Sequence, residues 1–273
     1  MIAATAIARR SEVSYFLSSL PLWLMIALIV VAPTVVAMAA QVLIRKRVGI
    51  NRLARNNEIA GFKFATVGVI YAVLLAFSVV VVWEKFSAGE AAVANEAGAT
   101  AALFRYAGGK EPEALALRTA LAKYLDAAIE DEWPAMGRET ESPAAQRALD
   151  SLYEAAMALN RSSARGAADM TEVFRQLDNV TAARRIRLQL ATGLVPDVIW
   201  IVLFMGALLT VGFTLFFGSE NLLAQVSMTG VLSVLVTMGL VVIISLDHPF
   251  AGSLSIHPDP LVLVLSDFRQ PPN

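Results

Sequence analysis

The fold is decided by residues 64–83, which read FATVGVIYAVLLAFSVVVVW and contain no charged side chain. An α-helix rises about 1.5 Å per residue, so a segment of this length crosses the ~30 Å hydrocarbon core of a bilayer. Three other stretches of similar or greater length also lack Asp, Glu, Lys and Arg: residues 21–44, 198–217 and 221–246. We therefore predict four transmembrane helices, because the core of a soluble protein rarely contains four such stretches.

The composition also indicates a membrane protein. Hydrophobic residues make up 57% of the 273 residues, charged residues make up 16%, and the mean hydropathy is +0.62. The formal net charge of −1 provides no basic excess for nucleic acid, so we expect no nucleic-acid partner. The chain has no cysteine, which excludes disulfides, thiolate metal sites and thiol nucleophiles.

The charged residues are concentrated in the middle of the chain. Of the 45 charged residues, 29 lie in residues 84–194, which we interpret as an extramembrane helical domain inserted between two pairs of spans. The predicted organisation is residues 1–83 for the N-terminal tail and the first two spans, 84–194 for the domain, 195–247 for the last two spans and 248–273 for the C-terminal tail.

Breakers and caps divide this domain into helices. The second span is expected to continue as one long helix to Tyr106, before Gly108-Gly109. A helix that starts at Pro112 should stop at Trp133-Pro134, a third should begin at Ser142-Pro143, and a fourth should cover about residues 169–192. In the C-terminal tail, Asp259-Pro260 predicts a short apolar helix that is too short to span and should dock elsewhere.

One face of the second span carries large apolar side chains at helical spacing: Ile70, Leu74, Phe77 and Val81. We predict that this face lines a hydrophobic constriction that gates by dewetting. The alternative is that the face contacts lipid or a neighbouring helix, because a valine-rich span needs no pore to explain it.

Three carboxylates, those of Glu84, Asp197 and Asp247, lie at the same predicted membrane boundary. They could form an acidic rim that repeats around an oligomer and sorts ions, or they could be ordinary charges at helix ends. Glu130-Asp131-Glu132 is interpreted as a solvated helix end, because three adjacent carboxylates on a helix point in different directions and make a poor calcium site.

Polar groups inside the spans are few. Thr229, Ser233 and Thr237 recur every four residues in the fourth span, and Thr210 lies in the third. Such hydroxyls either bond back to carbonyls of their own helix or line a wet path. With only two histidines, and no nucleophile elbow, Walker loop or paired metal-binding motif, the sequence predicts no enzyme, no bound metal and no cofactor.

The predicted orientation of the chain in the membrane follows from the basic residues of the short loops. The first loop holds six: Arg45, Lys46, Arg47, Arg52, Arg55 and Lys63. On the opposite face, Arg9, Arg10, Arg184, Arg185 and Arg187 are among the basic residues, most of them in long segments that count for little. We therefore expect a multi-pass protein of the inner (plasma) membrane, with the first loop cytoplasmic and the helical domain extracytoplasmic.

Several stretches together resemble the bestrophin-like membrane family. They are residues 57–62 (NEIAGF), residues 68–77 (GVIYAVLLAF), Trp83-Glu84 with Glu96, and residues 246–252 (LDHPFAG). The resemblance extends over nearly the whole chain. It implies an all-α integral membrane protein with four spans in two pairs around a helical domain. By more distant analogy to bestrophins, it implies an oligomeric anion channel, a pentamer, with the second span around a central pore.

The sequence departs from bestrophins in two respects. Bestrophins place their helical domain in the cytoplasm, whereas the loop charges here place it outside. Bestrophins also carry an acidic calcium clasp after the last span, whereas residues 248–273 contain no acidic run, so calcium gating is not expected.

The sequence thus predicts an oligomeric ion channel in a lipid bilayer, anion-conducting, with small ions and further copies of itself as partners. The alternative function is a non-conducting membrane protein whose helical domain binds a partner or senses a signal.

Overall fold

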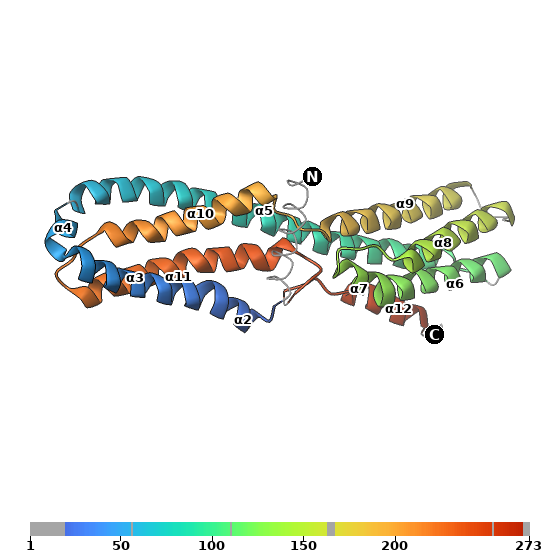
Figure 1. Cartoon of the computed structure of the whole chain (residues 1–273). Coiled ribbons are helices and arrows are strands. Elements are labelled where there is room, and N and C mark those ends of the chain that lie inside the picture. Colours follow the sequence, from blue (N-terminus) through green and yellow to red (C-terminus); the bar gives the residue numbers. More distant parts are fainter. Residues whose placement is uncertain (1–19, 56, 110, 163–166, 253, 270–273) are drawn as a thin grey trace, which may run out of the picture. The chain divides into compact units, whose positions relative to one another are not determined.

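The computed structural model describes residues 20–55, 57–109, 111–162, 167–252 and 254–269. Throughout these residues the regular structure is helical, with no strand, which confirms the all-α class (Figure 1). The chain divides into two compact units. The membrane unit comprises Met1–Glu84, Gly193–His248 and Gly252–Leu254, and the helical unit comprises Lys85–Thr192, Pro249–Ala251 and Ser255–Asn273.

The first span of the membrane unit contains a wide helical turn. It consists of α2 (Leu22–Ile26), a π-helical turn (Ala27–Val31) and α3 (Ala32–Val48). Pro33 has no backbone N–H, so the carbonyl of Ile29 loses its usual partner in the helix. The π turn lies directly before this proline, where a change in hydrogen bonding is needed in any case.

Three further spans complete the membrane unit. After the short α4 (Ile50–Ala54), they are formed by α5 (Asn57–Tyr106), by α10 (Asp197–Phe213) with a 3-10 turn (Thr214–Phe216), and by α11 (Leu222–Asp247). All four spans are long and apolar enough to cross a membrane, and α11 is the most buried of them. The second span does continue to Tyr106 in one helix, as the sequence predicted.

Large side chains meet glycines where the spans pack. The ring of Tyr71 on α5 lies against Gly206 of α10, and Leu75 lies against Gly239 of α11. On the other side of α11, Met38 of α3 contacts Gly230. Small residues let helices approach closely in lipid, where no hydrophobic effect drives them together. These contacts fix which face of α5 points toward its own unit.

The helical unit packs the rest of α5 with α6 (Pro112–Ala127), a π turn (Ala128–Glu132), α7 (Trp133–Met136), α8 (Pro143–Ser162) and α9 (Ala167–Leu190). Its core is rich in leucines and alanines at helical spacing, and the leucines include Leu103, Leu117, Leu121, Leu152 and Leu177. The start of α8 matches the sequence prediction. Ser142 accepts a hydrogen bond from the N–H of Ala145 as the N-cap of α8. By contrast, the helix from Pro112 does not stop at Trp133-Pro134 but continues through α7 to Met136.

The last helix, α12 (Asp259–Arg269), docks on the helical unit, as expected for a short apolar helix. Leu261 and Leu265 are buried in its core, and the ring of Phe268 stacks on that of Phe104 with 3.9 Å between centroids. The Arg269 guanidinium also lies 2.6 Å from the Asp126 carboxylate.

Candidate functional site

The apolar face predicted on the second span is exposed in the monomer. Ile70, Phe77 and Val81 expose 66%, 68% and 48% of their surface, and Leu74 is half-buried. The adjacent face of α5, which carries Tyr71, packs against its own unit, where the Tyr71 hydroxyl donates to the Leu203 carbonyl at 3.2 Å. The structure therefore leaves this face available to lipid, to another chain or to an aqueous path.

A small cavity of about 190 Å³ lies at the Val81 end of this face. Its walls are Leu74, Phe77, Ser78 and Val81 of α5 and Ile199 of α10, together with the linker at residues 194–196 that precedes α10. Three of the four predicted pore-lining side chains thus line the same cavity as the linker.

The three predicted rim carboxylates lie in different environments. Glu84 is exposed on α5, and Asp197 is half-buried in the first turn of α10. Asp247 is only 1% exposed, and its Oδ1 accepts hydrogen bonds from the backbone N–H groups of Leu194 at 2.9 Å and Val195 at 2.7 Å. Asp247 therefore holds a loop within the membrane unit, whereas Glu84 faces the surroundings.

The first loop is fastened to the turn between α10 and α11. The Arg45 guanidinium donates to the carbonyls of Ser219 at 2.6 Å and Glu220 at 2.8 Å. Asn57 bonds both the carbonyl and the N–H of Gly218, at 2.6 and 3.0 Å. Arg45 thus has a structural partner, and the exposed basic residues of the loop are Lys46, Arg47, Arg52, Arg55 and Lys63.

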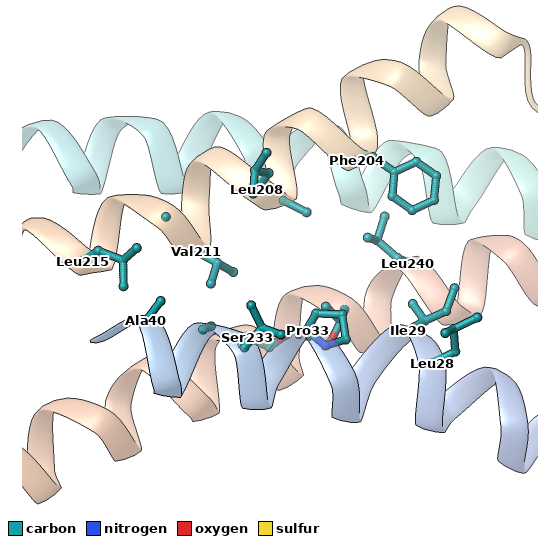
Figure 2. A pocket seen from close by; sticks show the side chains of 15 residues that line it. Leu28, Ile29, Pro33, Ala40, Phe204, Leu208, Val211, Leu215, Ser233 and Leu240 are labelled. Carbon is teal, nitrogen blue, oxygen red and sulfur yellow. Dashed lines mark hydrogen bonds between the residues drawn. The ribbon is translucent and has the colours of Figure 1, made fainter. Parts of the chain in front are cut away.

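A larger groove of about 570 Å³ lies among the first, third and fourth spans (Figure 2). Figure 2 shows Pro33, Ser233 and Leu240 among the side chains that line it, which are almost all apolar. The hydroxyl of Ser233 accepts a hydrogen bond from Thr34 at 3.0 Å, and Thr237 donates to the Ser233 carbonyl at 2.7 Å. Thr237 therefore bonds back to its own helix, and Ser233 joins two spans.

Thr229 makes a long contact of 3.4 Å with the Thr214 hydroxyl. Of these four hydroxyls, that of Thr237 bonds back to its own helix, and those of Ser233 and Thr229 contact hydroxyls of other segments. Thr210 is buried without a hydrogen bond to the described residues.

The helical unit contains a cluster of buried charges that involves four helical segments. The Arg187 guanidinium on α9 contacts Glu96 of α5 at 2.9 Å and Glu132 of the π turn at 2.8 Å, and all three side chains are fully buried. Arg184, one turn earlier on α9, contacts Glu132 at 2.6 Å. The Tyr124 hydroxyl on α6 donates to Glu96 at 2.6 Å. Two positive and two negative charges therefore balance inside the core.

The electrostatics of the cluster favour the charged arginine and the neutral tyrosine. Burial alone would lower the pKa of the Arg187 guanidinium, but the Glu96 carboxylate, with smaller contributions from Tyr124 and Glu132, raises that pKa above its ordinary value. Burial raises the pKa of the Tyr124 phenol well above 10.0, and the adjacent Glu96 carboxylate raises it further. Arg187 thus stays positive and Tyr124 stays a hydrogen-bond donor at any physiological pH.

This cluster corrects the interpretation of Glu130-Asp131-Glu132 as a solvated helix end, which is wrong for Glu132. A signal was present in the sequence: Glu96 follows the buried Val93 at helical spacing and precedes Leu103, so it lies on an otherwise apolar face. No group of three His, Asp or Glu side chains placed to hold a metal ion occurs among the residues that the structure describes.

Removing the Tyr124 hydroxyl should change the response of the protein to alkaline pH. Because the pKa of Tyr124 is raised on folding, its stabilising contribution is complete below pH 10.0 and declines as the pH rises beyond that value. We expect Tyr124→Phe to cost about 1–2 kcal/mol at neutral pH, from the lost bond to a carboxylate. The difference in stability between wild type and variant should shrink above pH 10, as measured by thermal unfolding in detergent. An unchanged difference up to pH 11.5 would contradict this assignment.

A comparison with protein families matches residues 31–261 to the bestrophin-like domain. The chain belongs to the bestrophin-like family. The match runs from the first span to α12 and includes α5, the ion cluster and Asp247. A search of curated proteins found no match.

Solved structures share the fold of this bestrophin-like chain. A variant of a bacterial bestrophin homolog from Klebsiella pneumoniae superposes with a TM-score of 0.69 at 13% identity, covering 87% of this chain and 98% of that one. A second structure of a bestrophin homolog from the same organism gives a TM-score of 0.67 at 13% identity, covering 86% and 94%. A structure described as a membrane protein gives 0.68 at 13% identity, covering 87% and 97%. The bestrophin-like chain is therefore a multi-pass membrane protein with this helical fold.

Proposed function

We propose that this protein is an oligomeric ion channel that conducts anions, with the apolar face of α5 as its neck. The observation that carries the proposal is the exposure of Ile70, Phe77 and Val81 on a helix whose adjacent face is packed against its own unit. An apolar ring of this kind controls passage by drying when it is narrow and wetting when it widens.

The proposal requires several copies of the chain. The described cavities within one membrane unit are lateral grooves between pairs or triplets of spans, lined by apolar side chains. A path for ions therefore has to form between subunits, and α5 offers the exposed face for it. Membership in the bestrophin-like family supports a closed oligomer, a pentamer by analogy.

Anion preference is attributed to the first loop. Lys46, Arg47, Arg52, Arg55 and Lys63 are exposed there, and repetition around an oligomer would raise the local concentration of anions at that mouth. We also propose that this loop is cytoplasmic and the helical unit extracytoplasmic. Buried carboxylates neutralise Arg184 and Arg187, so these two residues add little positive charge to the opposite face. Arg9 and Arg10, which are predicted on that face, lie outside the described residues.

The decisive experiment is reconstitution of the purified chain into liposomes, with chloride and potassium flux measured in parallel. We expect chloride flux to exceed potassium flux, and native mass analysis in detergent to show a closed oligomer. Exclusively monomeric protein without flux of either ion would overturn the channel and favour a partner-binding or sensing role for the helical unit.

A further inference from the structure

The end of α11 holds the linker before α10 by three hydrogen bonds. Asp247 Oδ1 accepts from the N–H groups of Leu194 and Val195, at 2.9 and 2.7 Å. The backbone carbonyl of Asp247 accepts from Leu194 as well, at 3.1 Å. A carboxylate that accepts backbone N–H groups forms charge-assisted hydrogen bonds, which are stronger than those of a neutral acceptor. Two of the three hydrogen bonds that hold residues 194–195 thus come from one side chain.

A second contact holds the same linker closely against this end of α11. A Cβ atom at Gly193 would lie 3.1 Å from Nε2 of His248 and 3.6 Å from Oδ2 of Asp247. A side chain at residue 193 would press on the buried His248 ring, whereas its distance to Asp247 would be an ordinary van der Waals contact. The linker is therefore fixed at residue 193 by shape and at residues 194–195 by hydrogen bonds.

The held segment forms one wall of the cavity beside the proposed neck. Leu194, Val195 and Pro196 line it together with Phe77 and Val81 of α5. Moving the linker would change the space available to these two side chains on the side that faces the cavity, and with it the rotamers open to them. Asp247 thus acts on Phe77 and Val81 through the linker, without being in the ion path itself.

We propose that Asp247 is a positioning residue: it holds residues 194–195 against Phe77 and Val81 and so sets the geometry of one end of the neck. This inference rests on the proposed function. It also assigns Asp247 a role other than that of a rim charge that sorts ions. A side chain with 1% exposure and two backbone donors on one oxygen is built to hold a loop, whereas ion sorting requires a carboxylate that ions can approach.

The test uses introduced thiols, because the chain has no cysteine of its own. Val195→Cys reports on the linker through its rate of modification by a small thiol reagent in detergent. We expect Asp247→Ala to raise this rate about tenfold or more through loss of two charge-assisted hydrogen bonds. Asp247→Asn keeps an oxygen acceptor at the same place but loses the charge, so it should raise the rate much less than Asp247→Ala does. Asp150→Ala removes an equal charge from an exposed helix surface and is the matched control.

Ion flux separates positioning from ion sorting. Asp247→Asn should keep the ratio of chloride to potassium permeability and the wild-type flux, whereas Asp247→Ala should change flux by severalfold. If Asp247→Asn alters the permeability ratio while the cysteine rate stays constant, Asp247 sorts ions and the proposal is overturned. An unchanged cysteine rate in Asp247→Ala also overturns it.

A second variant and the cysteine rates test the proposal even if Asp247→Ala does not fold or the protein does not conduct. Should Asp247→Ala fail to fold, Gly193→Ala disturbs the same contact more mildly and is expected to raise the cysteine rate by a smaller factor; no rise would count against the proposal. Should the wild-type protein conduct no ions, the channel function fails, while the cysteine rates still show whether Asp247 holds the linker.

Discussion

Replacement of Arg187 by methionine is expected to lower the free energy of unfolding of the helical unit by about 3–5 kcal/mol, because it leaves buried charge without its partner. Arg187 contacts both Glu96 and Glu132, and neither carboxylate is exposed to water that could replace the lost guanidinium. Glu132 keeps its contact with Arg184, but Glu96 keeps only the Tyr124 hydroxyl. Most of the cost should therefore arise at Glu96.

Hydrogen exchange of the full chain in detergent measures this effect. The slowest amides of α6 and α9 should exchange about 10²- to 4 × 10³-fold faster in the variant, the factor that corresponds to the expected loss of stability. Arg175→Met is the control on the same helix, because Arg175 pairs with Glu172 at the surface, and little change is expected there. Adding Glu96→Gln to Arg187→Met should restore much of the protection, since no unpaired charge then remains at that site. Unchanged exchange in the single variant would refute the role of the cluster.

Replacement of Phe77 by serine should raise ion flux by on the order of tenfold or more. If the exposed face of α5 forms the neck, each subunit contributes one Phe77 side chain to it. Removing that side chain lowers the free-energy cost of wetting the neck by about 2 kcal/mol per side chain. Phe77 is 68% exposed in the monomer, so its replacement leaves the interior packing of the membrane unit intact. Phe77→Ala should act in the same direction but more weakly, because alanine still repels water.

Leu208→Ser is the matched control for this experiment. Leu208 lies on α10, is 65% exposed and is also an apolar residue within a span, so the change costs a similar amount of lipid contact. Its flux should equal that of the wild type in liposomes of the same protein content. Equal flux from Phe77→Ser and wild type would place the ion path away from this face of α5.

The positions of the spans and the length of α5 could be predicted from the sequence, because both depend on local composition. Uncharged stretches define where lipid is the solvent, and the absence of a breaker before Gly108 carries α5 to Tyr106. Caps such as Ser142 mark helix ends for the same local reason. The apolar face of α5 also follows from spacing alone, although its role as a neck stays a prediction.

The ion cluster and the position of Asp247 could not be obtained in this way. Glu96 and Arg187 are 91 residues apart in the chain, and whether a charged side chain is buried depends on a partner that local sequence does not name. Asp247 is followed by His248-Pro249, a pattern that only indicates the end of a helix. Its two bonds to residues 194–195 arise from the packing of α11 against the linker, and no local pattern encodes them.

The π turn at Ala27–Val31 has a consequence for comparing the first span with other sequences. A π turn is equivalent to one inserted residue in an α-helix, and each residue of an α-helix turns the chain by about 100°. Deleting one amino acid from this turn would return it to regular winding and leave residues 22–26 facing the same way relative to α3, because a π turn fits one more residue into about the same rotation. Met25, now 1% exposed, would keep its buried position, so alignments of this segment need a single-residue gap before Pro33 wherever a homologue lacks the wide turn.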